Sequence, residues 1–491
     1  MIRRLALASS LLAVPTVAQG ADWPQFRGPG GLARSTSEVL PAALTPDGDV
    51  LWEADVVPGH SSPVIAGGRI FLTGFAEGRD VALCLDQKTG ETLWEKSFEG
   101  QAGMPFFHPD AELPALPTPV TDGERVVFYF GNYGLVAYDL EGKQQWEKRL
   151  PYPGYGFGVG SSPLLHEGLL VVPRDGAPEA AVLVLDVTDG EELWRMNRFQ
   201  FQESHGSPFL WSNADRDELI VGGTNQLTSY DLGSGEILWT VSGTCGFPCT
   251  TPTADEDTLY YAAWSTGEAE GRSFWEAAFT RSLELSDEEV ADPALLFRRL
   301  DKNEDGKVVP DEVPECRAKD AFGFIDSDRD GVWTVEELTS PPKGASNGRN
   351  LMVAVKRGGS GDVTKTHVRW TWTRGLPYVS SPLEYGGRLW LFKSGGIVTC
   401  LDAATGKPVF DRERLGDRGE YYMSPVGVAD RVLIGSAEGT FYVLDAKADE
   451  LSVLAEVDFG DELFATPAVL DGRVYLRSKS KLWAFGAPAG Q

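Results

Sequence analysis

A phrase of four short segments recurs along this chain, and it constrains the fold more than any other feature. The first copy consists of Ser61–Ile65, Gly68–Leu72, Val81–Asp86 and Thr89–Trp94. The segments are rich in β-branched and apolar residues and glycine marks the turns, so each copy predicts four antiparallel strands. Repetition of such a unit is the signature of solenoids, propellers and related arrays.

The two ends of the phrase show how the copies are joined. A Ser/Thr-Pro pair opens it eight times, with the prolines at Pro63, Pro119, Pro163, Pro208, Pro252, Pro382, Pro425 and Pro467. A closing strand follows only seven openings and carries Trp94, Trp146, Trp194, Trp239, Trp372, Phe410 or Leu454. The eighth opening ends the chain, and the missing strand is Leu51–Ala54 near the N-terminus.

Complementary ends of this kind predict an all-β ring, an eight-bladed β-propeller of four-stranded blades closed by the N-terminal strand. Such closure removes the exposed sheet edges that an open array would leave. A β-solenoid or two sandwiches would not need complementary ends. Each closing aromatic is expected to wedge between neighbouring blades and to bury about 200 Å².

The first twenty residues predict a secretory signal peptide. Arg3 and Arg4 give a basic start, Leu5–Val14 is largely apolar, and Ala18–Gly20 offers a cleavage site before Ala21. The apolar stretch is too short to cross a bilayer, and no later stretch is long enough. We therefore expect an exported protein, periplasmic or secreted, without a transmembrane segment.

The acidic composition limits the partners of the protein. Lys and Arg number 44 and Asp and Glu number 72, which gives a net charge of −28. Nucleic acids and anionic membranes need a basic surface, so we expect neither as a partner. An envelope or extracellular protein, a peptide or a carbohydrate remains open as the partner of a monomeric chain.

Residues 266–345 interrupt the fifth copy of the phrase with an acidic, helix-favouring segment. Its first twelve-residue loop has the pattern of an EF-hand, with oxygen ligands supplied by Asp301, Asn303, Asp305, the carbonyl of Lys307 and Glu312. Gly306 stands where this loop needs a sharp turn. Calcium requires six to eight oxygen ligands, including a bidentate carboxylate at the twelfth position, so the loop predicts a calcium site.

A second loop repeats the pattern, with ligands expected from Asp326, Asp328, Asp330, the carbonyl of Val332 and Glu337. Asp292 and Pro293 predict the start of a helix that leads into the first loop. Val308 and Trp333 hold equivalent loop positions, which predicts a short β-bridge between the two loops. The two loops are close together in the sequence, which favours a constitutive calcium module over a wide-opening sensor.

The insertion falls between the second and third strands of the fifth blade, on the face that carries the connections between blades. Those connections hold the candidate ligand-binding residues His60, Phe107, His108, Tyr155, Phe157, Glu203, His205, Tyr378, Tyr421 and Tyr422. They form either a binding funnel, partly covered by the insertion, or an aromatic plug between the inner strands. No catalytic residue is assigned.

The segment Leu83–Trp94 resembles the repeat of pyrroloquinoline-quinone (PQQ)-like β-propellers, and Asp22–Pro29 resembles the start of exported bacterial members, often labelled BamB-like. The resemblance covers the mature chain outside the insertion and implies this fold and export. The chain is thus divided into a signal peptide (1–20), blades one to five (21–265), an EF-hand pair (266–345) and blades five to eight (346–491).

The resemblance leaves the function open, because the superfamily includes quinone enzymes as well as assembly scaffolds. A PQQ-dependent dehydrogenase, the alternative function, would be expected to have a vicinal cysteine pair, a quinone-facing tryptophan and a calcium site in the funnel. Cys245 and Cys249 are separated by three residues. We therefore expect two calcium ions, no PQQ, and a non-catalytic scaffold or binding role through the insertion-bearing face.

Overall fold

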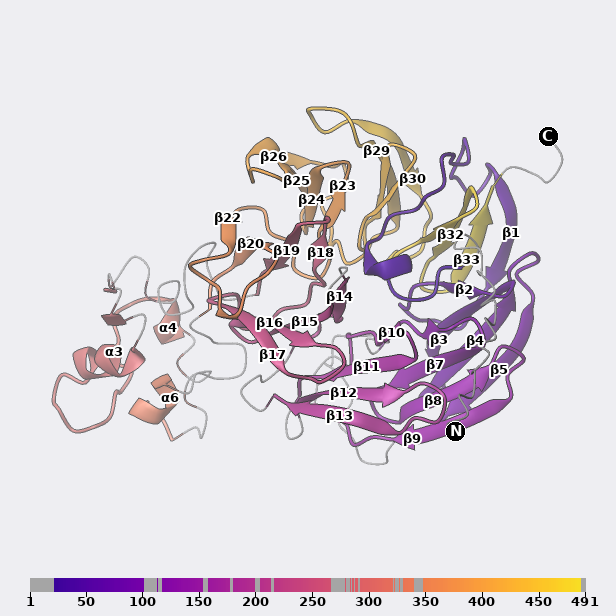
Figure 1. Ribbon diagram of the computed structural model, residues 1–491. Coiled ribbons are helices and arrows are strands. Elements are labelled where there is room, and N and C mark those ends of the chain that lie inside the picture. Colours follow the sequence, from indigo (N-terminus) through magenta and orange to yellow (C-terminus); the bar gives the residue numbers. More distant parts are fainter. Residues whose placement is uncertain are drawn as a thin grey trace, which may run out of the picture.

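The computed structural model describes residues 22–486 except 101–112, 114–116, 153–157, 177–179, 199–203, 213–215, 266–278, 280–282, 284, 287, 290, 291, 321, 323–325, 327–329 and 340–347. The expected signal peptide lies outside these described residues. Eight antiparallel sheets stand around a common centre, and Figure 1 shows them as a ring.

Each of the first four blades is a meander of consecutive strands. Blade 1 consists of β2 (Val64–Ala66), β3 (Arg69–Ala76), β4 (Arg79–Asp86) and β5 (Thr92–Phe98). Blade 2 consists of β6 (Val120–Thr121), β7 (Arg125–Phe130), β8 (Gly134–Asp139) and β9 (Gln144–Arg149). Blade 3 consists of β10 (Leu164–His166), β11 (Leu169–Arg174), β12 (Ala181–Asp186) and β13 (Glu192–Asn197). Blade 4 consists of β14 (Phe209–Ser212), β15 (Asp217–Gly223), β16 (Gln226–Asp231) and β17 (Ile237–Ser242).

The next three blades follow the same order. Blade 5 consists of β18 (Thr253–Ala254), β19 (Thr258–Ala263), β20 (Leu351–Lys356) and β22 (Val368–Trp372). Blade 6 consists of β23 (Leu383–Tyr385), β24 (Arg388–Lys393), β25 (Ile397–Asp402) and β26 (Pro408–Arg414). Blade 7 consists of β27 (Val426–Val428), β28 (Arg431–Gly435), β29 (Thr440–Asp445) and β30 (Val453–Asp458).

Blade 8 joins the two ends of the chain. It consists of β31 (Ala468–Leu470), β32 (Arg473–Arg477), β33 (Lys481–Phe485) and, as its outer strand, β1 (Val50–Asp55). Strand β1 pairs antiparallel with β33, and Trp483 Nε1 donates a hydrogen bond of 2.9 Å to the Glu53 carboxylate. The predicted eight-bladed ring of four-stranded blades, completed by the N-terminal strand, is therefore confirmed.

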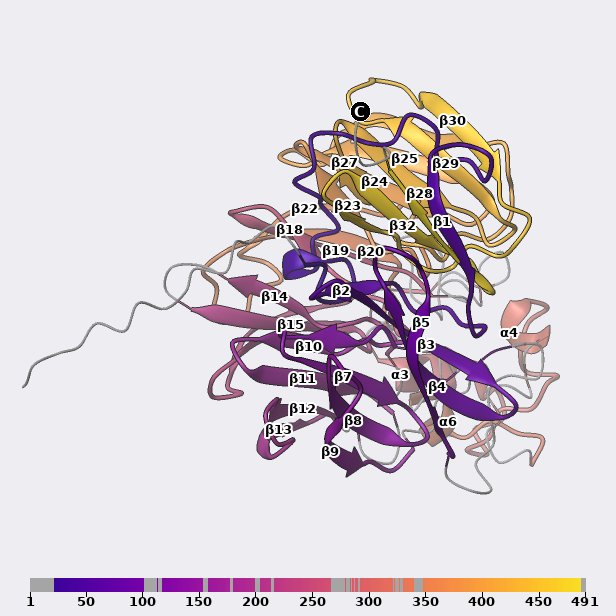
Figure 2. The ribbon, with the colours of Figure 1, turned by 90° about the vertical axis from the view of Figure 1, so that its right-hand side faces the viewer.

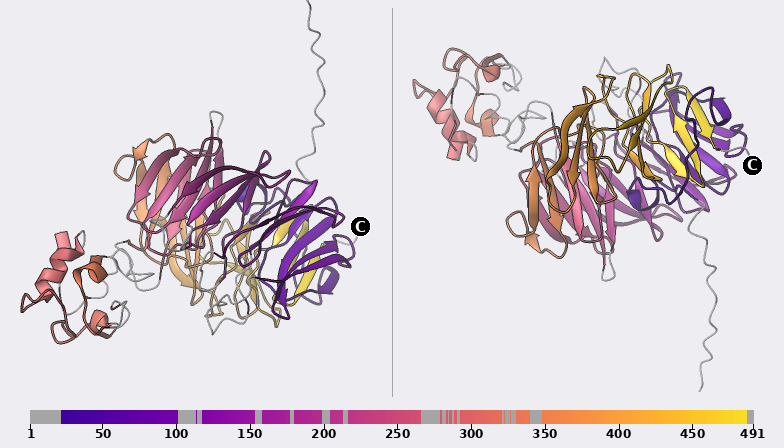
Figure 3. Two further views of the ribbon diagram at one scale, coloured as in Figure 1. Left: turned by 90° about the horizontal axis from the view of Figure 1, so that it is seen from below. Right: turned by 90° about the horizontal axis from the view of Figure 1, so that it is seen from above.

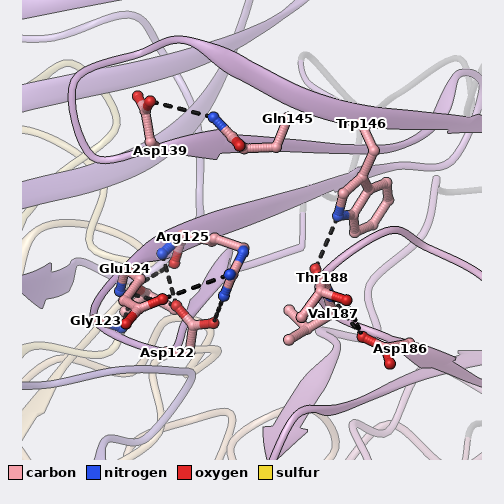
Figure 4. A network of polar contacts seen from close by, with 11 residues as sticks. Asp122, Gly123, Glu124, Arg125, Asp139, Gln145, Trp146, Asp186, Val187 and Thr188 are labelled. Carbon is pink, nitrogen blue, oxygen red and sulfur yellow. Dashed lines mark hydrogen bonds and ion pairs between the residues drawn. The ribbon is translucent and has the colours of Figure 1, made fainter.

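Tryptophans lock neighbouring blades together, as predicted. Five of them donate Nε1–H to a carbonyl in the next blade at 2.8–3.2 Å: Trp52, Trp94, Trp146, Trp194 and Trp370. Figure 4 shows Trp146 bonded to the carbonyl of Val187. Beneath that ring lies Gly190, whose φ is 75° and where an added Cβ would come within 2.8 Å of the indole. Glycine is needed at this turn because the backbone is left-handed and the ring is in contact.

The docking residue of blade 5 differs from the prediction. Trp370, rather than Trp372, reaches the next blade, where it bonds the carbonyl of Ala403. Trp372 donates instead to the carbonyl of Arg374. In blade 4, Trp239 bonds Glu218 of its own blade, and a short strand β21 (Gly361–Asp362) pairs parallel with β17.

The eight Ser/Thr residues before the repeated prolines form a closed circuit, here named the hydroxyl belt. Each backbone N–H of the belt donates to the hydroxyl oxygen of the equivalent residue in the next blade at 2.9–3.2 Å. The residues are, in order, Ser62, Thr118, Ser162, Ser207, Thr251, Ser381, Ser424 and Thr466, after which Thr466 bonds back to Ser62. The belt thus joins all eight blades around the centre.

The segment from Asp22 to Ser37, here named the floor segment, crosses the ring on the face opposite to the inter-blade connections. Trp23 pairs with Ile65 of blade 1, and the Arg27 guanidinium donates to the carbonyls of Pro252 and Pro382 in blades 5 and 6 at 3.0 and 2.6 Å. Further along, Ala33 accepts from Gly427 in blade 7. In Figure 2 its short helix η1 (Pro29–Gly31) lies between the N-terminal and the C-terminal blades.

The chain between β19 and β20 contains the helices α3 (Pro293–Leu300), α4 (Arg317–Asp320) and α6 (Val335–Thr339). Asp292 caps α3 through Ala294 N, as expected, and Val308 and Trp333 form the predicted bridge. This segment has a hydrophobic core of its own around Phe297 and Trp333. Figures 1 and 3 show the three helices outside the ring. Across the described residues, no helix is long and apolar enough to cross a membrane.

Candidate functional site

The centre of the ring holds a cavity of about 850 Å³, here named the cup. All eight residues of the hydroxyl belt line it, and Phe26 of the floor segment lines it from the opposite face. Of the predicted ligand-binding residues, His60, His205, Tyr378 and Tyr422 line the cup. Tyr421 is described but does not line the cup. The other five predicted residues fall outside the described part of the chain: Phe107, His108, Tyr155, Phe157 and Glu203.

Tyr421 points away from the cup. Its side chain is buried in the hydrophobic core of blades 6 to 8, and its hydroxyl donates to the carbonyl of Asp417 at 3.0 Å. The neighbouring Tyr422 faces the cup because consecutive side chains of an extended segment point in opposite directions. The prediction of Tyr421 as a ligand-binding residue is therefore wrong on geometry.

Aromatic rings gather on the wall formed by blades 7, 8 and 1. His60 stacks on Phe464 with ring centroids 4.2 Å apart, and Tyr422 lies 5.1 Å from the same ring. Burial, with a smaller contribution from Arg477 and Lys479, lowers the pKa of His60 to about 4. The imidazole is therefore neutral at pH 7, and its buried Nε2 has no hydrogen-bond partner among the described residues. Across the cup, His205 lies 5.2 Å from Phe247.

Three carboxylates lie on the same wall as the His60 stack: Glu420, Glu438 and Glu462. Glu462 accepts a hydrogen bond from Lys479 Nζ at 3.1 Å. Glu438 accepts from the backbone N–H of Glu420 at 3.2 Å. Burial, followed by the charge of Glu420, raises the pKa of Tyr422 to about 12. This part of the cup is therefore both aromatic and acidic.

These acidic residues were not among the sequence-based candidates. Glu420 stands in an inter-blade connection directly before the predicted residues Tyr421 and Tyr422. Glu462 and Phe464 stand in the connection between blades 7 and 8. Glu438 and Lys479 come from turns between the second and third strands of blades 7 and 8. Those turns reach the same face as the connections in any up-and-down blade, so topology could have indicated them.

The described wall does not suit the quinone that the fold resemblance implies. PQQ carries three carboxylates, whereas the described wall offers three carboxylates of its own and one lysine, which is already paired with Glu462. The described lining includes no tryptophan ring. Cys249 lines the cup, and Cys245 is buried. A trianionic ligand would be repelled by this wall.

The first insertion loop holds its oxygen ligands close together. Asp301 accepts backbone N–H bonds from Asp305 and Gly306 at 3.2 and 2.9 Å. Glu312 accepts from the N–H of Lys302 and of Val309, both at 3.0 Å. Asp301 and Glu312 are each 8% exposed. Gly306 has a φ of 80°, which explains the glycine at this turn.

The same bonds recur in the second loop. Asp326 accepts from the N–H of Asp330 and of Gly331 at 3.1 and 2.9 Å, and Glu337 accepts from Thr334 N at 2.9 Å. In both loops the side chain at the fifth loop position accepts a hydrogen bond from the backbone N–H at the seventh: Asp305 from Lys307 N at 2.9 Å, and Asp330 from Val332 N at 3.0 Å. The predicted ligands Asn303 and Asp305 are hydrogen-bonded to each other, and Asp328 lies outside the described residues.

The insertion contributes no residue to the described lining of the cup. The expectation that it partly covers the funnel therefore finds no support in the described part of the chain. On the floor-segment face, His166, Glu167 and Asp217 bring one potential ligand atom each to within 4.8 Å. His166 Nε2 and Asp217 Oδ2 lie 3.1 Å apart, which is the distance of an ordinary hydrogen bond.

Comparison with known proteins places the chain in a family. The family described as outer membrane protein assembly factor BamB matches residues 36–178, 178–281 and 394–491. No curated protein matches the sequence. Among solved structures, BamB from Moraxella catarrhalis superposes with a TM-score of 0.51 at 12% identity, over 89% of this chain and 99% of that chain.

Two dehydrogenases of known structure have the same fold. A europium-containing methanol dehydrogenase gives a TM-score of 0.55 at 10% identity, over 96% of this chain and 98% of that chain. A quinohemoprotein alcohol dehydrogenase from Comamonas testosteroni gives 0.53 at 13% identity, over 97% and 82%. At such identities the structural similarity shows the fold alone. The family match extends over more than half of the sequence, and the chain belongs to the family described as outer membrane protein assembly factor BamB.

Proposed function

We propose that this protein is an exported, calcium-binding β-propeller that captures a ligand or a protein partner at the cup, as a non-catalytic scaffold or binding protein of the periplasm or extracellular space. Membership of the BamB family supports export and a protein partner. The acidic sequence supports a partner other than a nucleic acid.

The observation that carries the calcium assignment is the set of buried carboxylates in the two insertion loops. Asp301, Glu312 and Asp326 are each less than 9% exposed, and their hydrogen bonds in the loops come from backbone amides. A buried carboxylate is costly unless a cation or several hydrogen bonds compensate its charge. The backbone bonds orient each carboxylate, and a hard divalent cation would supply the missing charge.

The observation that carries the binding assignment is the cup itself. Its volume of about 850 Å³ lies within the range of ligand sites, and its wall combines aromatic rings with a few polar groups. The floor segment covers the opposite face, so a ligand would enter from the face of the inter-blade connections.

Calorimetric titration of the full chain with Ca²⁺ tests the proposal. We expect two bound ions for the wild type and one for Glu312→Gln or Glu337→Gln, each of which removes a bidentate ligand. Glu450→Gln, an exposed carboxylate of blade 7, is the matched control and should retain two. Capture of envelope components by immobilised protein, with His205→Ala as the cup variant and Leu93→Ala as the surface control, tests the binding role. If the protein took up no calcium, the calcium-binding part of the proposal would be wrong. If His205→Ala left capture unchanged, the binding role of the cup would be wrong.

A further inference from the structure

We infer that the cup recognises a cationic group, an ammonium or guanidinium carried on an extended chain, at the wall made by Tyr422, Phe464, Glu420 and Glu438. This inference rests on the proposed function, because it names the chemistry of the ligand for that same face. The cation could be the side chain of a basic peptide or a free polyamine, and the chemistry of recognition is the same for both.

Among the residues that the structure describes, the negative charges on this wall are only partly compensated. Lys479 neutralises Glu462 through a contact of 3.1 Å. Glu420 and Glu438 lie next to each other, joined by the hydrogen bond from Glu420 N to a Glu438 carboxylate oxygen. Among the described residues, no lysine or arginine side chain is paired with either of them. Ser394 donates a hydroxyl hydrogen bond to Glu420, which helps to orient that carboxylate.

Two neighbouring carboxylates with no cation between them repel each other and attract any positive group that can reach both. They are solvent-exposed, so each attraction is modest and screened by salt. Affinity for a cation therefore requires a second source of binding energy beside the carboxylates.

The aromatic rings of the wall supply that second source. The ring centroid of Phe464 lies 4.2 Å from that of His60 and 5.1 Å from that of Tyr422, so the three rings form one aromatic cluster on the wall that also carries Glu420. A cation over such rings gains cation–π attraction, and the methylene groups of its chain are removed from water. Because burial lowers the pKa of His60 to about 4, this imidazole adds no competing positive charge at pH 7.

The positions of the residues that line the cup favour an extended ligand. Below the wall lie the hydroxyl belt and, at the bottom, Phe26. Each belt oxygen accepts one backbone N–H and keeps a second lone pair and its own hydrogen. The belt can therefore form hydrogen bonds with a polar end group that is either a donor or an acceptor. A chain with one charged group at the wall and a polar group at the belt would use both features.

Calorimetry on the calcium-loaded full chain tests the inference, with trilysine and spermidine as cationic probes and triglutamate and maltotriose as anionic and neutral ones. We expect binding of at least one cationic probe, weakening as NaCl rises from low to physiological concentration. Trilysine alone would indicate a peptide ligand, and spermidine alone a free polyamine. Binding of triglutamate or maltotriose but of neither cation would overturn the inference.

Variants of the wall supply the second readout. Glu420→Gln combined with Glu438→Gln keeps the shape of the wall and should weaken the cationic probe about tenfold, while Tyr422→Ala should weaken it by a similar factor. Glu450→Gln should leave the affinity unchanged. Equal affinity in wild type and double variant would overturn the inference. If the double variant still captures envelope components that His205→Ala loses, the inference of a cationic ligand is wrong, while the proposed binding role of the cup stands.

Discussion

At the scale of single residues, buried charges differ in whether a partner compensates them. Arg198 and Asp175 are both fully buried and form a bidentate pair at 2.7 and 2.8 Å. Asp80 in β4 is only 3% exposed, and its Oδ2 has no hydrogen-bond partner in the part of the chain that the structure describes. Burial therefore raises the pKa of Asp80 to about 7. Asp175 offsets the cost of burial by pairing its charge with Arg198, whereas Asp80 avoids that cost as a neutral, protonated acid.

Asp80 predicts a pH dependence of stability. The unfolded chain releases the Asp80 proton near pH 4 and the folded protein near pH 7, so the free energy of unfolding should fall by about 1.4 kcal/mol per pH unit across that interval. Asp80→Asn should remove this slope and raise stability at pH 8 more than at pH 4. Urea unfolding at the two pH values checks it, with exposed Asp257→Asn as control. A variant less stable than wild type at pH 8 would contradict the neutral-acid interpretation.

The same scale shows how far the sequence pattern reaches. Trp370 and Trp372 lie on the same side of β22, because side chains two residues apart in a strand share a face. Strand alternation therefore cannot tell which of the two tryptophans contacts the next blade. The contact depends on the position of the blade 6 turn, where Trp370 bonds the carbonyl of Ala403. Tyr421 and Tyr422 point to opposite sides of the chain. Because their connection contains no regular strand, the sequence does not show which of the two side chains faces the cup.

At the scale of elements, the repeated strands, the closing strand and the insertion loops were predictable, and the floor segment was not. The loops around Asp301 and Asp326 are specified within twelve consecutive residues, so spacing alone indicated them. The floor segment follows no period, because each of its residues is fixed by a different blade. Its Arg27 and two aromatic residues stand in an otherwise loop-like sequence, and that combination is the signal that an ordered crossing segment leaves.

The floor segment predicts a specific loss of stability. Arg27 is fully buried and donates to carbonyls in blades 5 and 6. Arg27→Met keeps much of the volume but leaves these acceptors without a donor, which should cost about 2–4 kcal/mol of unfolding free energy. Urea denaturation measures it, and Arg418→Met, at an exposed arginine, should change stability by less than about 0.5 kcal/mol. A loss no larger than that of the control would show that the crossing segment is not held by Arg27.

At the scale of the whole molecule, the ring and the insertion have separate hydrophobic clusters among the described residues. The hydroxyl belt and the floor segment tie the blades to one another, so local opening of one blade breaks bonds in its neighbours. The insertion buries Phe297, Val308 and Trp333 against its own residues, without side chains from the propeller in that cluster. Its folding should therefore depend on its own metal ions, while that of the ring should not.

Differential scanning calorimetry of the full chain separates the two units. On the proposed function, bound Ca²⁺ would add its binding free energy to the stability of the insertion, whereas a chelator would leave the buried carboxylates of the Asp301 and Asp326 loops without a cation. We expect chelation to shift one small transition to lower temperature and to leave the large transition of the ring within about a degree. Glu312→Gln combined with Glu337→Gln should reproduce the chelated pattern in the presence of Ca²⁺. A single transition that moves as a whole would show instead that the insertion and the propeller unfold together, and calcium would then stabilise the cup as well.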